Sequence, residues 1–177
     1  NPVLEGIVET MLRVRTLLLA ELANIDGQLT ALAKSDPITR LLMTTPGVGV
    51  IVALTFRSAV DDPDRFPRSR DVGAWAGLTP RRWQSGKMDI SGRITKAGDP
   101  RVRVMLFEAA ASILGRARVM SPLKAWGLRI AKRTSMKKAI VAVSRKLATI
   151  LLAMWKSGTA YWAAGRPPAS AQDLAAA

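Results

Sequence analysis

Residues 78–99, LTPRRWQSGKMDISGRITKAGD, bring hydroxyl and cationic side chains together in one short stretch. The hydroxyls of the nucleophilic type are Ser85, Ser91 and Thr95. The cations around them are Arg81, Arg82, Lys87, Arg93 and Lys96. Such cations can hold a phosphodiester and spread its developing negative charge, and a serine among them can attack the phosphorus to form a covalent link. The stretch is therefore a candidate for either nucleophilic chemistry or plain nucleic-acid binding, and its spacing does not choose among the three hydroxyls.

The composition removes most of the usual partners for such a hydroxyl. The chain has no histidine and no cysteine, which excludes Ser-His-Asp triads, disulfides and thiolate metal sites. A neutral serine needs a base, and none stands beside these hydroxyls in the sequence, so the residues alone favour a binding hairpin with exposed serines. We interpret Asp61, Asp62 and Asp64 as turn and N-cap residues because Pro63 lies among them, and we predict no metal or cofactor site in this chain.

The charge is concentrated in one part of the chain. Residues 1–60 hold five Lys and Arg against five Asp and Glu, whereas residues 61–166 hold 22 against seven, and the whole chain has a net charge of +14. This asymmetry predicts a polyanionic partner, with nucleic acid as the first candidate and an anionic membrane surface as the second. The longest apolar stretch, residues 138–156, carries Arg145 and Lys146 at its middle, so we expect no membrane span.

The elements that must position these groups are mainly helical. Residues 3–34 are predicted to form one long helix, with apolar residues at three- and four-residue steps. These residues are Leu4, Val8, Met11, Leu18, Leu22, Ile25, Leu29 and Leu32. We assign residues 1–35 to a coiled-coil-like arm, and an extended bundle helix is the alternative that the pattern leaves open.

A short helix over 37–43 leads into TTPGVGVIVALTF, residues 44–56. Pro-Gly-x-Gly between two apolar helices is typical of a helix-hairpin-helix element. Gly47 and Gly49 would allow the tight turn and let backbone amides contact a phosphate. A plain helix–turn–helix connection is the structural alternative.

Further along, we predict helices over 68–77, 100–115, 122–132 and 134–157, and a small β-hairpin with strands 80–85 and 90–95 around a turn at 86–89. Arg101 and Arg103 lie in the first turn of a helix, which is unfavourable for the helix dipole unless an anion lies there. Lys137, Lys138, Arg145 and Lys146 give the last helix a basic face. The fold class is thus a mainly α helical bundle with a small hairpin, assigned to residues 36–162 and followed by a disordered tail at 163–177.

Four motifs resemble one family in order and spacing over about residues 40–160. They are PGVG (46–49), FPRSRDVGAWAGLTPRRWQSG (66–86), ITKAGDPRVRVML (94–106) and KKAIVAVSRKLATILLAMWKSGTAYW (137–162). The chain is similar to the C-terminal transposase domain, with the preceding coiled-coil segment, of insertion-sequence transposases of the one-ten type, which are RNA-guided DEDD/serine recombinases.

The resemblance implies which hydroxyl reacts. The family's nucleophilic serine follows TPRR, an aromatic residue and one further residue, which here is Ser85, and it attaches covalently to a DNA end. The resemblance also implies DNA and guide RNA as partners, and from charge and position alone we expect the cations named above to contact them. It further implies a dimer or tetramer formed through the arm, and a cytoplasmic, nucleoid-associated place in a prokaryote.

The resemblance places Mg²⁺ in a resolvase-like domain that we expect this chain to lack, since it begins at Asn1-Pro2 rather than Met. On that expectation the chain alone would be inactive. Two other functions stay open: a non-catalytic helix-hairpin-helix module that binds nucleic acid, and a coiled-coil assembly subunit.

Overall fold

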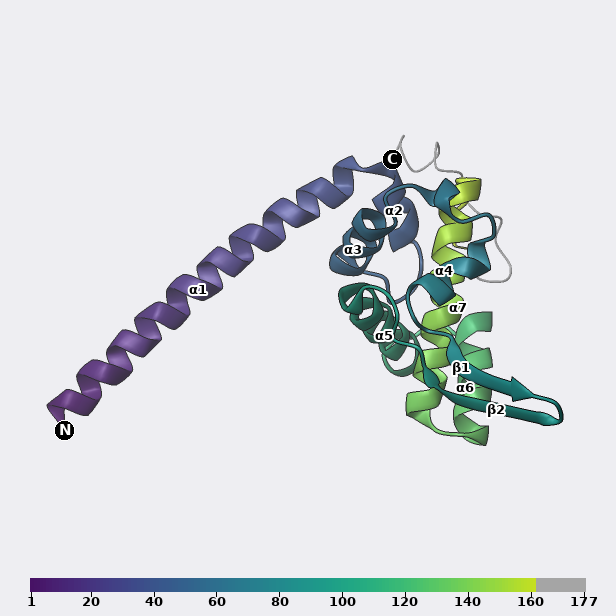
Figure 1. Ribbon diagram of the computed structural model, residues 1–177. Helices are drawn as coiled ribbons and strands as arrows, with labels where there is room; N and C mark the ends of the chain where they lie inside the picture. Colours follow the sequence, from purple (N-terminus) through teal and green to yellow (C-terminus); the bar gives the residue numbers. More distant parts are fainter. Residues whose placement is uncertain (162–177) are drawn as a thin grey trace.

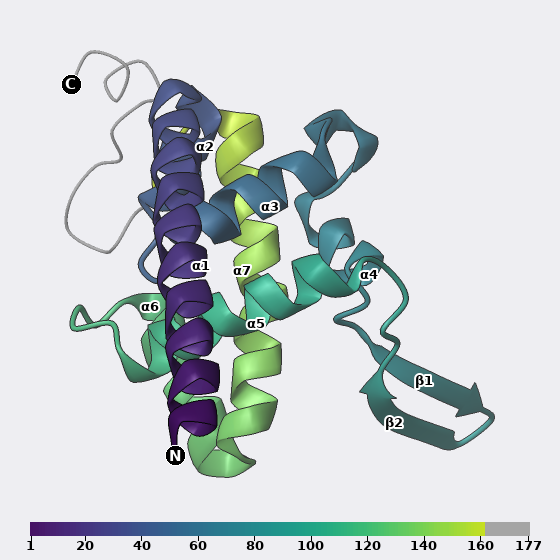
Figure 2. The same ribbon diagram turned by 90° about the vertical axis from the view of Figure 1, so that its left-hand side faces the viewer.

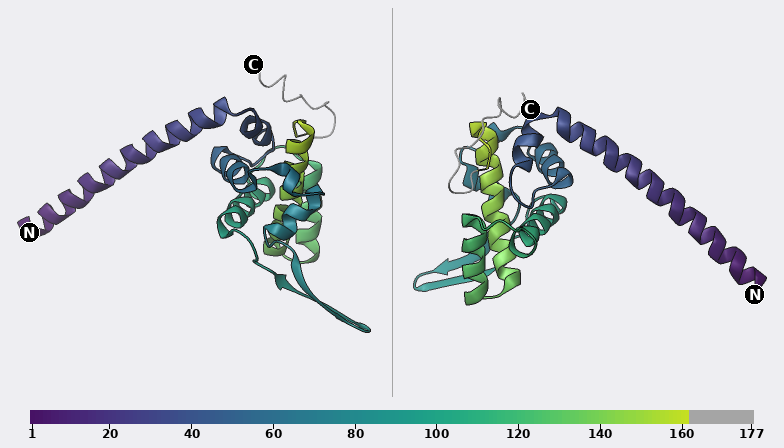
Figure 3. Two further views of the ribbon diagram at one scale, coloured as in Figure 1. Left: turned by 45° about the horizontal axis from the view of Figure 1, so that its top comes forward. Right: turned by 180° about the vertical axis from the view of Figure 1, so that it is seen from behind.

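The computed structural model describes residues 1–161 and shows a helical body from which a long helix and a β-hairpin project in different directions (Figures 1 and 3). The α-helices are α1 (Pro2–Ser35), α2 (Pro37–Met43), α3 (Val50–Val60), α4 (Val72–Trp75), α5 (Pro100–Gly115), α6 (Pro122–Arg133) and α7 (Met136–Ser157). Two short 3₁₀ turns, η1 (Pro63–Arg65) and η2 (Ser69–Asp71), precede α4. The strands are β1 (Pro80–Ser85) and β2 (Met88–Ile94). The prediction of a mainly α fold with one small hairpin is confirmed.

Local capping chemistry fixes where the body helices begin. Asp99 caps α5 by accepting a hydrogen bond of 2.7 Å from the backbone amide of Arg101, and Ser121 caps α6 by accepting one of 3.1 Å from Lys124. Proline follows each cap, where its missing N–H leaves no bond unmade. These signals lie within a few residues of each helix start, which is why the predicted starts of α5 and α6 are confirmed.

The core is built around α7. This helix packs against α5, α6, α2 and α4, and its Leu147, Leu151 and Leu152 are fully buried. Phe56 of α3 and Leu106 of α5 complete the centre of the same cluster. Burial of side chains of this size contributes about 1.5–3 kcal/mol each relative to exposure. None of the helices within residues 1–161 combines the length and apolarity that crossing a bilayer requires.

Helix α1 leaves the body as a largely uncovered arm (Figure 1), which points toward the viewer and overlaps the body in the view of Figure 2. Ala33, close to its C-terminal end, is the one buried residue of α1, and within residues 1–161 the arm packs mainly on α2 and α3. Large apolar side chains elsewhere on α1, such as Leu18 and Leu22, are 63% and 54% exposed. The predicted long helix is confirmed, whereas its function as a coiled coil stays a prediction.

Two predicted elements differ from the structure. Residues 68–77 form the 3₁₀ turn η2 and a single α-helical turn, because Gly73 and Gly77 leave too few helix-favouring residues for a longer helix. The hairpin turn is shorter than predicted, since β2 begins at Met88 rather than at residue 90. The predicted disordered tail, 163–177, lies outside the described residues.

Asp36 holds the junction between the arm and the body. Its carboxylate accepts hydrogen bonds from the amide and the hydroxyl of Thr39 and lies 3.7 Å from Arg57. Burial raises the pKa of this carboxyl, but the Thr39 hydrogen bonds and the charge of Arg57 outweigh it and lower the pKa below its usual value. Ionised Asp36 therefore stabilises the folded state.

This lowered pKa predicts a pH dependence of stability. The contribution of Asp36 is present above the pKa of the unfolded chain and is lost as pH falls through the lower pKa of the folded state. Urea unfolding between about pH 6 and pH 3 should show a shallower loss in Asp36→Asn than in the wild type. Asp36→Ala should cost about 1 kcal/mol at neutral pH because the cap is lost. The control Asp26→Asn alters an acid that has no ion pair among residues 1–161 and should follow the wild type. Identical pH profiles for Asp36→Asn and the wild type would contradict this assignment.

Candidate functional site

Ser85 lies at the tip of the projecting hairpin. It ends β1 and pairs with Met88, and Gly86 and Lys87 alone connect the two strands. Gly86 adopts a φ of +55°, a conformation that glycine reaches without steric cost and that two-residue hairpin turns require. The hairpin projects from the body (Figure 1), so the serine is held on a tight turn outside it, and Ser85 is exposed.

The two faces of the hairpin differ in chemistry. Directly paired residues share a face, so Ser85 lies on the same side as Trp83, Met88 and Ile90. These three apolar side chains are 56%, 61% and 53% exposed. The other face carries Arg82, whose guanidinium donates two hydrogen bonds of 2.9 and 2.7 Å to the carboxylate of Asp89. Ser85 therefore lies among exposed apolar groups, and one of its nearby cations is already paired.

The root of the hairpin is clamped onto the body by close backbone contacts. A Cβ on Gly98 would lie 2.0 Å from the carbonyl oxygen of Trp75, and Gly98 has a φ of +116°. A Cβ on Gly77, whose φ is +68°, would lie 2.5 Å from the amide nitrogen of Ala97. Arg103 Nη1 reinforces this contact by donating hydrogen bonds of 3.1 Å to the carbonyls of Ala76 and Gly98. Arg103 is thus half-buried at the hairpin root and engaged within the protein.

A cleft of about 830 Å³ lies between the hairpin root, α6 and the first half of α7. We call it the hairpin cleft. Its walls include Leu78, Ile94, Trp126 and Val141, and its cations are Arg93, Lys96, Lys137, Lys138 and Arg145. None of the carboxylates within residues 1–161 lines it. An apolar surface bordered by cations can accept an anion that also carries an apolar part.

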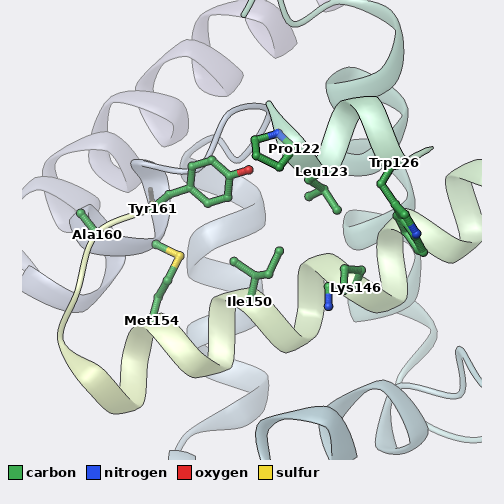
Figure 4. Close-up of a pocket in the computed structure, with 8 residues that line it drawn as sticks. All are labelled: Pro122, Leu123, Trp126, Lys146, Ile150, Met154, Ala160 and Tyr161. Carbon is green, nitrogen blue, oxygen red and sulfur yellow. The ribbon is translucent and has the colours of Figure 1, made fainter. Parts of the chain in front are cut away.

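A second pocket, of about 440 Å³, also has Trp126 in its lining (Figure 4). Tyr161, Met154 and Ile150 line it, together with Lys146. Arg145 and Lys146 are neighbours in sequence, but only Arg145 reaches the hairpin cleft.

The structure brings some of the predicted site residues together and separates others. Strand β1 runs five residue steps from Pro80 at the root to Ser85 at the tip, roughly 17 Å at the usual rise. Arg93 and Lys96 belong to the root side, so within this chain they do not surround Ser85. Ser91 is the hydroxyl that lines the hairpin cleft. Sequence reasoning missed Trp126, whose position in the cleft depends on how α6 packs.

The glycine turn between α2 and α3 has two different glycines. Gly47, with a φ of +80°, is pressed against α5, because a Cβ there would lie 2.8 Å from the side chain of Ile113 and 2.9 Å from the carbonyl of Ala109. Gly49 precedes α3, where a Cβ would meet nothing within 4 Å, and it provides no side-chain cap. Gly47 therefore has a packing function, while a phosphate contact stays a prediction for both. Arg101 is exposed at the start of α5.

The acidic residues in the described part of the chain do not fit a metal site. Within residues 1–161 no three or more acidic, histidine or cysteine side chains cluster closely enough to hold a metal ion. Asp62 instead accepts a 2.8 Å hydrogen bond from the amide of Asp64 and caps η1, as the sequence predicted, and Asp64 lies 3.7 Å from Lys156. The magnesium site that the resemblance implies cannot be built from these residues.

Comparison with known proteins shows to which class of protein this chain is similar. The chain is 32% identical to the transposase for insertion sequence element IS1111A of Coxiella burnetii over 84% of this chain and 43% of that protein. It is 34% identical to the putative transposase y4pF/y4sB of Sinorhizobium fredii over 81% of this chain and 38% of that protein. It is 28% identical to the transposase for insertion sequence element IS1328 of Yersinia enterocolitica over 80% of this chain and 42% of that protein. The chain therefore carries a transposase domain, and it spans less than half the length of these relatives.

The family of the chain is identified by a match to residues 39–125, which include the glycine turn between α2 and α3, the hairpin and α5. This segment matches the family described as Transposase IS116/IS110/IS902 family. The chain belongs to this family, and the resemblance seen in the sequence motifs is confirmed.

The hairpin root generates a stability prediction. Gly98→Ala should destabilise the protein by at least about 2 kcal/mol, because the new Cβ meets the Trp75 carbonyl and the backbone conformation disfavours alanine. Gly115→Ala is the matched control, since a Cβ there meets nothing within 4 Å, and its effect should stay within about 0.5 kcal/mol. Urea denaturation measures both, and equal stabilities for the two variants would contradict the clamp.

Proposed function

We propose that this domain acts on DNA in transposition and that Ser85 is the nucleophile for strand exchange. The observation that carries the proposal is the position of Ser85, exposed on a two-residue turn at the tip of a hairpin whose root is clamped to the body. A nucleophile must approach the phosphorus of a large substrate closely, and a projecting tip gives it that access. The family motif, in which the reactive serine follows TPRR, selects the same residue.

The proposed step is a transesterification. The Ser85 oxygen forms a bond to the phosphorus of a DNA phosphodiester, and the bond from that phosphorus to one deoxyribose oxygen breaks. The serine proton leaves to a base, and the departing strand takes up a proton on its new hydroxyl. Attack by the hydroxyl of another strand then reverses the step and releases Ser85, so no external energy source is needed.

The base and the stabilisation of negative charge would come from outside the described residues. Asp89 is the nearest carboxylate by register, but it lies on the opposite face and is held by Arg82. We infer that the acids of a resolvase-like segment, with their Mg²⁺, approach the apolar face around Ser85. These acids would belong to the same transposase chain or to a second subunit. Within this chain, Lys87 at the turn is the cation closest to Ser85 in sequence.

The cations of the body would bind the polynucleotide. Those of the hairpin cleft, with Arg81, Arg101, Lys146 and the Gly47–Gly49 turn, are the candidates for DNA or guide RNA. Such a protein would work at the nucleoid of a bacterial cell.

A second candidate function is a binding module without chemistry. The observation that favours it is the distance between Ser85 and the cations at the hairpin root, since this chain does not surround its serine with charge. This alternative predicts that removing cations matters and that removing the Ser85 hydroxyl does not.

We also propose that α1 self-associates. Counted along α1, residues 4, 8, 11, 15, 18, 22, 25, 29 and 32 form an unbroken alternation of four- and three-residue steps, and Arg15 is the only polar member. Two or more copies would bury this stripe, which a monomer leaves exposed to water. A single charged residue at such a position sets the register and number of helices at a cost in stability.

The nucleophile prediction uses two serines of the same hairpin. In the intact transposase, Ser85→Ala should abolish strand exchange while DNA affinity stays within about twofold, because the hydroxyl reacts but contributes little to binding. Ser91→Ala is the matched control and should retain exchange. Gel assays of strand exchange and of DNA binding measure the two properties. Normal recombination by Ser85→Ala would refute the proposal.

The arm prediction uses residues that are exposed in a single chain. Leu18→Lys combined with Ile25→Lys should convert an oligomer into a monomer, because both residues lie on the apolar stripe and the body does not depend on them. Ala20→Lys combined with Asn24→Lys adds the same charge off the stripe and should leave the oligomer intact. Sedimentation at micromolar concentration distinguishes these outcomes, and a monomeric wild type would overturn self-association.

A further inference from the structure

The hairpin cleft combines charge and apolar surface in a way that the proposed chemistry at Ser85 does not use. Five cations line it, and none of them forms an ion pair within residues 1–161. They come from two separate parts of the fold, with Arg93 and Lys96 from the hairpin root and Lys137, Lys138 and Arg145 from α7. Like charges held together repel one another, so the arrangement favours a polyanion that neutralises several of them at once.

The apolar part of the lining indicates what else the ligand carries. Trp126 is half-buried on α6 and lines the cleft together with Leu78, Ile94 and Val141. In a duplex the faces of the bases are stacked on one another, so that only base edges, sugars and phosphates are exposed. An unpaired nucleotide exposes the faces of its base, which can stack on an aromatic side chain while its phosphates contact cations.

We propose that the hairpin cleft binds an unpaired nucleotide segment of a single strand, with a base against Trp126 and the flanking phosphates on the cations of the hairpin root and α7. A volume of about 830 Å³ lies in the range of pockets that enclose compact organic ligands. The inference rests on the proposed polynucleotide partner and deepens it, since it specifies an unpaired strand next to the root of the hairpin that carries Ser85. DNA and RNA strands share this chemistry.

The test measures the affinity of the 177-residue chain for labelled oligothymidylate, oligouridylate and a DNA duplex, each of about 15 nucleotides per strand. Trp126→Ala should weaken binding to the single strands by roughly 10- to 100-fold, because stacking contributes about 1–3 kcal/mol per base. Its binding to the duplex should change by less than about twofold. Trp126→Phe keeps an aromatic platform and should bind nearly as the wild type does. The single-strand probe that binds more tightly, oligothymidylate or oligouridylate, shows whether the bound strand is DNA or RNA.

A double variant that removes two lysine charges tests the cleft without substituting the half-buried Trp126. Lys137→Gln with Lys138→Gln, both exposed, should lower the salt dependence of single-strand binding by about 1.4 for two lost phosphate contacts. Arg116→Gln with Arg118→Gln removes the same charge from two exposed side chains after α5, outside the cleft, and should leave that slope unchanged.

Three outcomes would overturn the inference. Equal affinity for duplex and single strands, or an equal decrease of the salt dependence in the two double variants, would refute binding in the cleft while leaving a polynucleotide partner intact. Failure to bind any probe would refute both the cleft and the nucleic-acid function.

Discussion

The close contact between Gly98 and the carbonyl of Trp75, reinforced by Arg103, is the constraint on which the rest of the structure depends. A two-stranded hairpin is at best marginally stable by itself in water, and this one presents exposed Trp83, Met88 and Ile90. Its orientation must therefore be set at its root. Because the two glycines and the arginine lock that root onto α4 and α5, the tip can extend from the body and still have a defined direction. The same root forms one wall of the hairpin cleft.

This arrangement separates two tasks that the sequence places side by side. The tip carries a serine with few free charges, and the root carries charges with a different serine, Ser91. A chain built in this way fits a composite site, in which the cleft and the basic helices hold the polynucleotide and a second protein surface meets the tip. The exposed apolar face around Ser85 is consistent with such a surface, since apolar groups of this size gain stability when they are covered.

Local signals made most of the fold predictable. Asp36-Pro37, Asp99-Pro100 and Ser121-Pro122 place a capping side chain before proline, and the helices begin there. Residues 68–77, predicted as one short helix, form a 3₁₀ turn and a single α-helical turn, because the glycines of this segment disfavour a longer helix. The family, and the choice of Ser85 as the proposed nucleophile, came from motif resemblance, since spacing alone left Ser85, Ser91 and Thr95 equivalent. The parts that could not be predicted depend on tertiary contacts. No local pattern indicates that Trp126 of α6 lines the same cleft as the hairpin root, or that Arg103 donates to two carbonyls rather than to a phosphate. The separation of Ser85 from Lys96 also depends on the strand register. The predicted turn, residues 86–89, is two residues longer than the observed turn, because Ser85 pairs with Met88.

The identity of the reactive hydroxyl is the central claim, and one measurement tests it directly. Trypsin cleaves after Arg82, Lys87, Arg93 and Lys96, so Ser85, Ser91 and Thr95 fall on three different peptides, 83–87, 88–93 and 94–96. The intact transposase would be denatured during strand exchange, digested with nuclease and trypsin, and analysed by mass spectrometry. We predict a residual nucleotide on peptide 83–87. A nucleotide on either of the other two peptides, or on none while exchange proceeds, would contradict the account.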